Sequence, residues 1–261
     1  MTALRARSVT VELGGRVALD GLDLAAEGGS LVGLIGPNGA GKSTALRALA
    51  GLLPRRAGRV EIDGAPIETL APRALARRLA YLPQGRELGW PMAVERVVGL
   101  GRLPHLGPFA GPGPEDAAAV ARALDRADVA HLARRPAGAL SGGERARALL
   151  ARALAVEAPI LLADEPTAAL DPFHQLQVME VLRGAARAGD LVVVVLHDLA
   201  LAARFCDRLV LLAGGRTLAD GPPAEVLDGP RLAEAYGVEA LRGEHEAELY
   251  VLPWRRLARA G

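Results

Sequence analysis

The stretch Gly36-Pro37-Asn38-Gly39-Ala40-Gly41-Lys42-Ser43 decides the fold. It fits the pattern G-x-x-x-x-G-K-[ST] at every fixed position, directly after the apolar run 31–35 and directly before a helical pattern. Glycines allow successive backbone N–H groups to point inward at phosphate oxygens, and the start of the next helix adds positive partial charge. The sequence therefore predicts a phosphate-binding loop between a buried strand and a helix.

Two residues of this loop have separate expected roles. Lys42 is the single Lys among 31 basic residues, and this position requires a compact ammonium that reaches the β- and γ-phosphates of a nucleotide. Ser43 is expected to offer its hydroxyl to Mg²⁺. The expected nucleotide contacts are Gly36, Pro37, Asn38, Gly39, Ala40, Gly41, Lys42, Ser43 and Thr44.

Apolar runs outside the loop predict an α/β fold. The runs 31–35, 160–163 and 191–196 are continuous rather than alternating, which is typical of buried parallel strands, and 9–13 and 59–62 predict shorter strands. Helices are expected over 42–52, 72–78, 142–156, 172–187 and 199–206. Strands that alternate with helices indicate a covered, mostly parallel sheet.

An acidic pair, Asp164 and Glu165, directly follows the run 160–163. The carboxyl end of a strand in an open α/β sheet faces the crevice in which ligands bind. Asp164 is therefore expected to hold Mg²⁺, directly or through water. Glu165 is expected to polarise a water for in-line attack on a γ-phosphate.

Four further motifs follow a fixed order. They are Tyr81-Leu82-Pro83-Gln84, Leu140-Ser141-Gly142-Gly143-Glu144, Ala169-Leu170-Asp171, and His197 after the run 191–196. With the phosphate loop, this set resembles the ATP-binding-cassette (ABC) family of transporter ATPases over roughly residues 4–235. The resemblance implies a P-loop NTPase core with a mostly parallel sheet, an N-terminal antiparallel β region and an inserted helical subdomain.

The resemblance also implies roles for single residues. Gln84 would touch Mg²⁺ or the attacking water and report the nucleotide state to a partner. His197 would hydrogen-bond the γ-phosphate and orient Glu165. Asp171 would organise the facing site across a dimer. The expected catalytic residues are Glu165, His197, Gln84 and Lys42, and the expected Mg²⁺ ligands are Ser43, Gln84 and Asp164.

The signature motif, Ser141, Gly142, Gly143 and Glu144, is a second phosphate-seeking feature, because its N–H groups lie at a helix start. In the ABC family, two subunits pack head-to-tail, and each ATP lies between the phosphate loop of one and the signature motif of the other. The resemblance therefore implies a homodimer that binds two ATP with Mg²⁺. Its further partners would be transmembrane permease subunits and, indirectly, a periplasmic or extracellular substrate-binding protein.

The expected adenine contact departs from the family pattern. The family stacks adenine on an aromatic ring from the loop after the first strand, and this chain has Leu13 there. Leu13 can pack against a base but lacks a stacking surface. The guanidinium of Arg16 can also lie over a base. Leu13 and Arg16 are therefore the expected base contacts.

Two short motifs, 101–105 and 171–175, resemble the import ATPases that serve iron-siderophore, haem and cobalamin permeases. They favour the motor subunit of a metal-chelate importer, peripheral on the cytoplasmic face of the plasma membrane. Arg102, His105 and Phe109 are expected to border a groove for a permease helix; for Arg102 and His105 a solvated loop is the alternative. His174 and Gln175 are expected to cap or pack at a helix start.

The chain is expected to divide into three parts. Residues 1–87 and 156–240 form the nucleotide-binding core, and 88–155 form the helical signature subdomain, because no convincing strand pattern occurs there. Residues 241–261 form a tail with a strand at 248–252. We expect the tail to pack on the core; contact of its cationic end with lipid or permease is the alternative.

Composition argues against several other classes. A net charge of +1, from 31 basic and 30 acidic residues, argues against nucleic acid as a partner. The single cysteine, Cys206, rules out a disulfide framework. The N-terminus lacks the apolar stretch of a signal peptide, and the run 191–196 is too short to span a bilayer.

Three alternatives stay open at this stage. The chain could be the ATPase subunit of another ABC importer or of an exporter, because only two short motifs separate these classes. It could be a non-transport ABC ATPase that acts on nucleic acid or the ribosome. It could also be a regulatory nucleotide-binding module without turnover, although the presence of Glu165 and His197 argues against that class.

Overall fold

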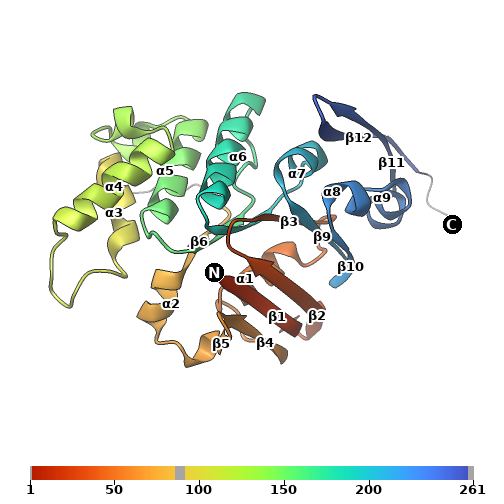
Figure 1. Cartoon of the computed structure of the whole chain (residues 1–261), viewed down its shortest axis with the longest axis horizontal. Coiled ribbons are helices and arrows are strands. Elements are labelled where there is room, and N and C mark those ends of the chain that lie inside the picture. Colours follow the sequence, from red (N-terminus) through yellow and green to blue (C-terminus); the bar gives the residue numbers. More distant parts are fainter. Residues whose placement is uncertain (1, 86–91, 258–261) are drawn as a thin grey trace.

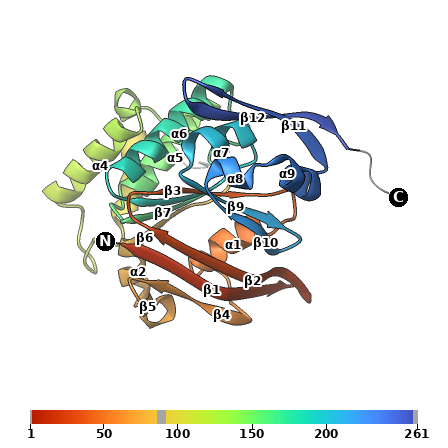
Figure 2. The same ribbon diagram turned by 45° about the vertical axis from the view of Figure 1, so that its right-hand side comes forward.

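A computed structural model describes residues 2–85 and 92–257. The expected boundary between residues 87 and 88 lies outside these described residues, as do the last residues of the tail, 258–261. Figures 1 and 2 show a central sheet, a second sheet below it, helices above it and a group of helices at one edge.

The central sheet has the strand order β10-β9-β3-β8-β7-β6. Its strands are parallel except β10, which pairs antiparallel with β9. The bounds are β3 Leu31–Ile35, β6 Leu79–Leu82, β7 Ile160–Asp164, β8 Leu191–Val195, β9 Arg208–Ala213 and β10 Arg216–Gly221. The order brings the carboxyl ends of β3, β8, β7 and β6 to one edge of the sheet.

The continuous apolar runs have a physical cause in this sheet. Every residue of β3, β7 and β8 is buried. Alternate residues of β8 face different cores: Val192 and Val194 pack with the upper helices, whereas Val193 and Val195 pack with the lower sheet. A strand covered on both faces needs apolar residues at every position, as the sequence predicted.

A second, antiparallel sheet lies below the central one, with the order β2-β1-β4-β5. The helix α1, Lys42–Leu49, contacts β1, β2, β7 and β8 and so lies between the two sheets. The bounds are β1 Ala3–Leu13, β2 Arg16–Glu27, β4 Ala57–Ile62 and β5 Ala65–Pro66. The expected N-terminal antiparallel region is confirmed, and β1 and β4 are longer than predicted.

Helices α3, α4 and α5 contact one another and form a group beyond strand β6, at the left in Figure 1. Within described residues 92–155 the only β pairing is an isolated bridge between Ala93 and Pro136, which agrees with the expected helical insertion. The bounds are α2 Pro72–Arg78, α3 Val94–Gly99, α4 Pro114–Arg126, α5 Gly142–Leu154, and the 3-10 turns η1 Ile67–Thr69, η2 Leu100–Arg102, η3 Ala130–Leu132 and η4 Ala137–Ala139.

The upper helices lead into a C-terminal hairpin. Their bounds are α6 Pro172–Arg187, α7 Leu199–Phe205, α8 Pro223–Val226 and α9 Gly229–Tyr236, followed by β11 Val238–His245 and β12 Glu248–Arg256. The hairpin lies on α7, where Val251 is fully buried and Arg204 Nε donates to Glu248 at 2.5 Å. Its outer side exposes Tyr250, Leu252 and Trp254.

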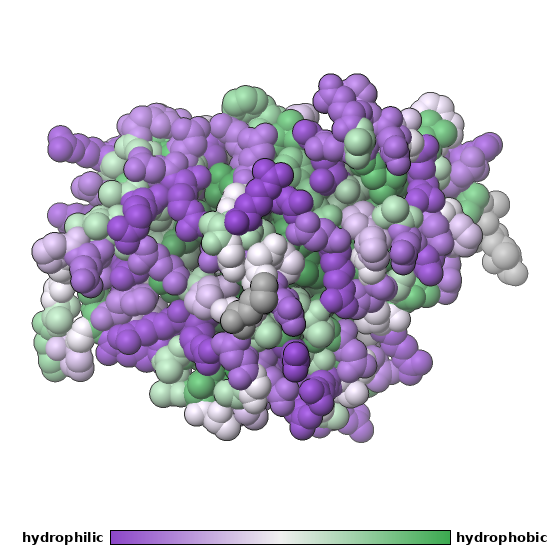
Figure 3. Space-filling view, in the orientation of Figure 1, coloured by the Kyte–Doolittle hydropathy of each residue, from purple (hydrophilic) through white to green (hydrophobic). Residues whose placement is uncertain are grey.

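On the face seen in Figure 3, hydrophilic side chains are interspersed with smaller apolar groups. One apolar group lies at the lower left, over the loop between η2 and α4, where Leu103 and Phe109 are exposed. In the described part of the chain, no helix combines the length and apolar character that crossing a membrane requires.

Candidate functional site

The phosphate loop is pressed against its neighbours at two glycines. Gly36 has φ +147°, and a Cβ built there would lie 2.2 Å from the carbonyl oxygen of Leu212 in β9. Gly41 has φ +97°, and a Cβ there would lie 2.7 Å from the carbonyl oxygen of Ala18 in β2. These backbone conformations and close approaches require glycine, which explains two fixed positions of the motif.

Lys42 lies inside this loop and is 5 % exposed. Its Nζ donates to the carbonyl oxygens of Gly36 at 2.8 Å and Pro37 at 3.0 Å. Burial lowers the pKa of Lys42, whereas the nearby carboxylates of Glu165 and Asp164 oppose this shift. The ammonium is therefore curled back within the loop that is expected to surround the phosphates.

Asp164 ends β7 beside the first turn of α1 and is 1 % exposed. Its Oδ1 accepts a hydrogen bond from the Ser43 hydroxyl at 2.8 Å, and its Oδ2 accepts one from the Tyr81 hydroxyl at 3.2 Å. A buried carboxylate needs such partners. Sequence reasoning missed Tyr81, although it stands three residues before Gln84 at the end of the neighbouring strand β6.

Glu165 is held between two side chains from other strand ends. Gln84 Nε2 donates to Glu165 Oε2 at 2.8 Å, and His197 Nε2 lies 2.6 Å from Oε1. Gln84 follows β6, and His197 follows β8, so the parallel sheet places all three residues at one edge. Glu165 itself has φ +51°, an uncommon conformation for this residue type that turns the chain directly after the strand.

The phosphate loop, Glu165 and His197 surround a hollow of about 330 Å³. Its lining is Ala18, Asn38, Gly39, Ala40, Gly41, Lys42, Ser43, Thr44, Glu165 and His197. The volume lies at the lower end of the range for small-molecule sites. Ala18 was not predicted, because nothing in the sequence indicates that β2 approaches the loop at Gly41.

The two expected base contacts lie outside this lining. Leu13 ends β1 and Arg16 begins β2, and the two residues pair across a turn made by Gly14 and Gly15. The Leu13 side chain is exposed at the tip of this hairpin. Of the β1–β2 hairpin's described residues, Ala18 is the one that reaches the hollow.

The signature motif begins helix α5 with a capping box. Ser141 Oγ accepts from the Glu144 backbone N–H at 3.3 Å, and Glu144 Oε2 accepts from the Ser141 N–H at 2.7 Å. The N–H groups of Gly142 and Gly143 precede the first intrahelical bonds, so they are available to an anion. None of the four signature residues lines the hollow of the same chain.

Asp171 caps the start of α6, and His174 in the first turn of this helix binds Asp171. Asp171 Oδ1 accepts from the His174 backbone N–H at 3.1 Å, and Oδ2 lies 2.7 Å from His174 Nδ1. Gln175 Nε2 donates to the Thr167 carbonyl oxygen at 3.5 Å. The expectation that His174 and Gln175 cap or pack at a helix start is confirmed.

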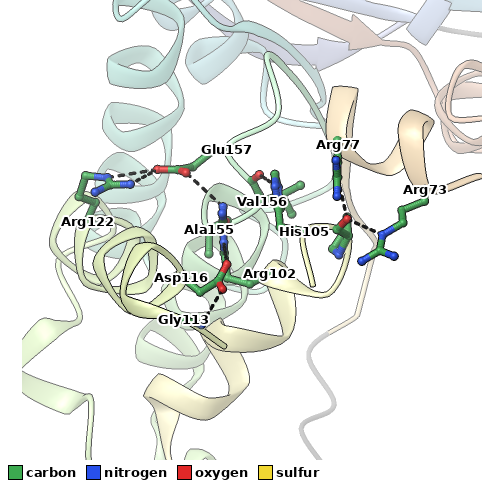
Figure 4. A network of polar contacts seen from close by, with 11 residues as sticks. Arg73, Arg77, Arg102, His105, Gly113, Asp116, Arg122, Ala155, Val156 and Glu157 are labelled. Atoms are coloured by element: carbon green, nitrogen blue, oxygen red, sulfur yellow. Dashed lines mark hydrogen bonds and ion pairs between the residues drawn. The ribbon is translucent and has the colours of Figure 1, made fainter. Parts of the chain in front are cut away.

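Both expectations for Arg102 are wrong, because this side chain is buried inside the helical group and hydrogen-bonded there. It is 6 % exposed; its Nε donates to Asp116 Oδ1 at 2.9 Å, and its Nη1 donates to the Ala155 carbonyl oxygen at 2.8 Å. Nη1 also lies 3.1 Å from Glu157, which pairs with Arg122 (Figure 4). Neither a solvated loop nor a permease groove can contain the guanidinium.

His105 extends the same network (Figure 4), and Pro104 joins it through its carbonyl oxygen. His105 is half-buried, and its Nε2 lies 2.8 Å from the carbonyl oxygen of Val156, just beyond α5. The Pro104 carbonyl oxygen accepts from Arg73 Nε at 2.8 Å and from Arg77 Nε at 2.7 Å, both on α2. The motif 101–105 therefore ties α2 to the end of the signature helix, and only Phe109 of the three expected permease contacts stays fully exposed.

The arrangement of phosphate loop, acidic strand end and strand-end histidine agrees with comparisons to known proteins. The sequence profile described as ABC transporter matches residues 19–168, more than half of the chain. The chain belongs to the ABC transporter family. This ABC protein is 51 % identical over 252 residues to the hemin import ATP-binding protein HmuV of Streptomyces coelicolor, a match that covers 96 % of this chain and 89 % of the relative.

Two solved structures are similar to this ABC protein. One is an inward-facing, putative metal-chelate type ABC transporter, with 25 % identity, a TM-score of 0.84 and 98 % coverage of both chains. The other is a dimeric ATP-binding cassette in a post-hydrolysis state bound to ADP and Pi, with 30 % identity and a TM-score of 0.72 over 84 % of this chain and 98 % of that one. The resemblance to ABC transporter ATPases and the expected fold class are confirmed.

Proposed function

We propose that this ABC protein is the ATP-hydrolysing subunit of an importer of metal chelates, and that haem is its cargo. The observation that carries the hydrolytic part is the Glu165 carboxylate, held between Gln84 and His197 at the wall of the phosphate-loop hollow. The choice of haem rests on the 51 % identity to a hemin import ATP-binding protein.

The hydrolytic step follows from the positions of these side chains. Glu165 accepts a hydrogen bond from a water molecule. This bond makes the water a stronger nucleophile toward the γ-phosphate. His197 orients the carboxylate through its Nε2–H and, when ATP is bound, turns this N–H from Glu165 to the γ-phosphate. Lys42 exchanges its bonds to the Gly36 and Pro37 carbonyl oxygens for bonds to the β- and γ-phosphates.

The oxygens of Ser43 and Asp164 fit Mg²⁺. They lie 2.8 Å apart at the start of α1, and hydroxyl and carboxylate oxygens are ligands that Mg²⁺ prefers. Among the described residues no cluster of three or more His, Cys, Asp or Glu side chains forms a metal cage, which suits an ion held mainly by water and phosphates. Bound there with Gln84 nearby, Mg²⁺ would neutralise charge on the phosphate oxygens.

Two copies of the chain are needed to complete each site. The signature motif lies outside the hollow of its own chain, yet its helix start offers N–H groups to an anion. A head-to-tail homodimer brings Ser141, Gly142 and Gly143 of one subunit to the ATP of the other, and Asp171 to the same interface. The dimeric ADP-bound relative supports this arrangement.

We further propose that the parts 1–87 with 156–240, 88–155 and 241–261 are functional units, and that the first two move relative to each other. ATP-driven closure of the dimer would displace transmembrane permease subunits that receive haem from a substrate-binding protein. The subunit would work peripherally on the cytoplasmic face of the plasma membrane. Leu13 and Arg16 would approach adenine only when nucleotide is bound.

Reconstitution tests this proposal. The chain is co-purified with its permease, placed in proteoliposomes with the substrate-binding protein and ATP, and offered haem, cobalamin or a ferric siderophore. ATP-dependent uptake of haem alone is expected, and liposomes with Glu165→Gln should show none. Uptake of another chelate would overturn the cargo, and export or no ATP-dependent transport would overturn the function.

A further inference from the structure

His174 contacts two motifs that the hydrolytic site of its own chain does not use. Its Nδ1 lies 2.7 Å from Asp171 Oδ2, and its ring lies against Gly143 of the signature motif. The two motifs belong to different helices, α6 and α5. His174 is thus the side chain through which Asp171 and the start of the signature helix touch.

The contact with Gly143 leaves no room for a side chain. A Cβ built on Gly143 would lie 2.0 Å from His174 Cδ2 and 2.4 Å from Cγ. A Cβ built on the adjacent Gly142 would meet nothing within 4 Å. The two neighbouring glycines therefore differ in the space available for a side chain, because the imidazole of His174 lies against Gly143 alone.

The contact with Asp171 fixes the ring. Asp171 accepts from both the backbone N–H and the side chain of His174, and these bonds lower the pKa of Asp171, the backbone bond most strongly. An ionised carboxylate can only accept hydrogen bonds, so Nδ1 of His174 carries the hydrogen. Because Nδ1 faces Asp171, the opposite edge of the ring faces Gly143. The side chain of His174 is 25 % exposed, whereas that of Asp171 is 60 % exposed and accessible to a partner.

We infer that His174 is a positioning residue that holds Asp171 and the signature motif in one fixed arrangement, so that each subunit presents both to the ATP of its partner. This inference rests on the proposed homodimer. His174 does not line the hollow of its own chain, so it acts through the two motifs rather than on substrate. Its loss should weaken assembly of the ATP-bound dimer and leave nucleotide binding by a single subunit intact.

Thermal unfolding tests the contact itself, without any assumption about dimers. Gly143→Ala should lower Tm by about 3 °C or more, because the new methyl group overlaps the ring. Gly142→Ala, the matched control, should not lower it. Adding His174→Ala to Gly143→Ala should restore part of the loss. If the double variant is no more stable than Gly143→Ala, the ring does not set the identity of residue 143.

Dimer assembly tests the positioning role. In a Glu165→Gln background, size-exclusion chromatography measures the ATP concentration that yields half-maximal dimer. His174→Ala should raise this concentration about tenfold, and His174→Asn, whose amide can still donate to Asp171, should restore part of it. A fluorescent ATP analogue should bind all monomers equally well. An unchanged ATP dependence for His174→Ala would overturn the inference.

The two proposals fail in different ways. If Glu165→Gln does not form an ATP-dependent dimer, the proposed two-site function is wrong, and the inference built on it is wrong as well. If Glu165→Gln does form that dimer, His174→Ala can be judged by itself. If His174→Ala changes neither the ATP dependence of this dimer nor, with Glu165 intact, the KM for ATP, only the role of His174 is wrong.

Discussion

Nε2 of His197 lies 2.6 Å from Oε1 of Glu165, although the two residues follow different strands. Gln84 holds the other carboxylate oxygen at 2.8 Å. Both oxygens of Glu165 are therefore oriented by neighbours that come from β6 and β8, and the carboxylate can keep one direction toward the hollow. Because the orientation of this side chain is fixed, a variant that removes only its charge tests its role as a base.

Glu165→Gln should lower kcat for ATP hydrolysis by about 100-fold or more, because an amide is a far weaker base than a carboxylate of the same shape. Nucleotide binding should persist. Steady-state phosphate release and equilibrium binding measure the two quantities. Glu234→Gln on the exposed side of α9 is the matched control and should keep the parental rate. A normal rate for Glu165→Gln would exclude this residue as the base.

Lys42→Arg keeps the charge and changes the shape. The ammonium sits between two carbonyl oxygens at 2.8 and 3.0 Å in a loop that leaves it 5 % exposed, so a larger planar group cannot occupy the same place. We expect kcat/KM for ATP to fall by about 100-fold. Circular dichroism checks that the fold is intact. Parental activity in this variant would refute the geometric argument for Lys42.

The sequence predicted the parts of the site that local patterns encode. The phosphate loop follows one continuous apolar strand, and Asp164 and Glu165 follow another. The sequence therefore allowed the inference that the loop and the two carboxylates lie at the same edge of the sheet. Strands β2, β6, β9 and β10 were not predicted, because their burial depends on neighbours far along the chain. The Gln84 motif at the end of β6 did not by itself indicate a strand before it. Tyr81 lies at the site because β6 pairs with β7, and Ala18 lies there because β2 approaches the phosphate loop at Gly41. Neither arrangement can be inferred from a local pattern.

Arg102 shows why long-range partners escape sequence reasoning. Its carboxylate partners, Asp116 and Glu157, stand 14 and 55 residues later in the chain, and no local pattern links the three. Arg102 directly precedes residues 103–114, which are rich in Pro and Gly, and its position therefore suggested a surface loop. The contact of His174 with Gly143 was hidden for the same reason, although both residues lie in motifs that the sequence analysis singled out.

Arg102→Ala should lower the free energy of unfolding by about 2–3 kcal/mol, because it removes a buried guanidinium and takes one hydrogen-bond donor from Asp116 and one from the carbonyl oxygen of Ala155. Arg122→Ala is the matched control: its side chain is 59 % exposed and binds the same Glu157, so the expected loss is about 0–1 kcal/mol. Urea denaturation measures both. Equal losses would show that the burial of Arg102 does not determine its contribution.

Glu144 should make the stability of the signature helix depend on pH. The backbone N–H of Ser141 and its hydroxyl hold the pKa of Glu144 below its usual value. A lowered pKa in the folded state stabilises the fold above the unfolded-state value of about 4.3, and this stabilisation is lost as the pH falls through the lower folded-state value. The pH window of the effect is therefore acidic.

Glu144→Gln keeps the capping box without an ionisable group. The difference in free energy of unfolding between the parent and this variant should be largest near pH 7 and should shrink as the pH approaches about 3. Urea denaturation at a series of pH values measures the difference. A constant difference over this range would contradict the pKa shift.

Cys206 should be chemically inert in the folded chain. Burial raises the pKa of its thiol to about 12, and only the thiolate reacts with alkylating agents. At pH 8, iodoacetamide should label the native protein at less than about 1 % of the rate in 8 M urea, by intact-mass spectrometry. Equal rates would mean that the thiol is accessible in the native state.

Helix α5 is held at both ends. His174 lies against Gly143 at its first turn, and Arg102 and His105 bind the carbonyl oxygens of Ala155 and Val156 beyond its last turn. Its 13 residues span about 20 Å at about 1.5 Å per residue. A stiff rod of this length that tilts by about 5° displaces its far end by about 2 Å, which is enough to break a hydrogen bond to a phosphate. In the proposed homodimer, a small shift of the Pro104 loop against α2 would therefore move the signature end of α5 far enough to make or break its contact with the partner's nucleotide.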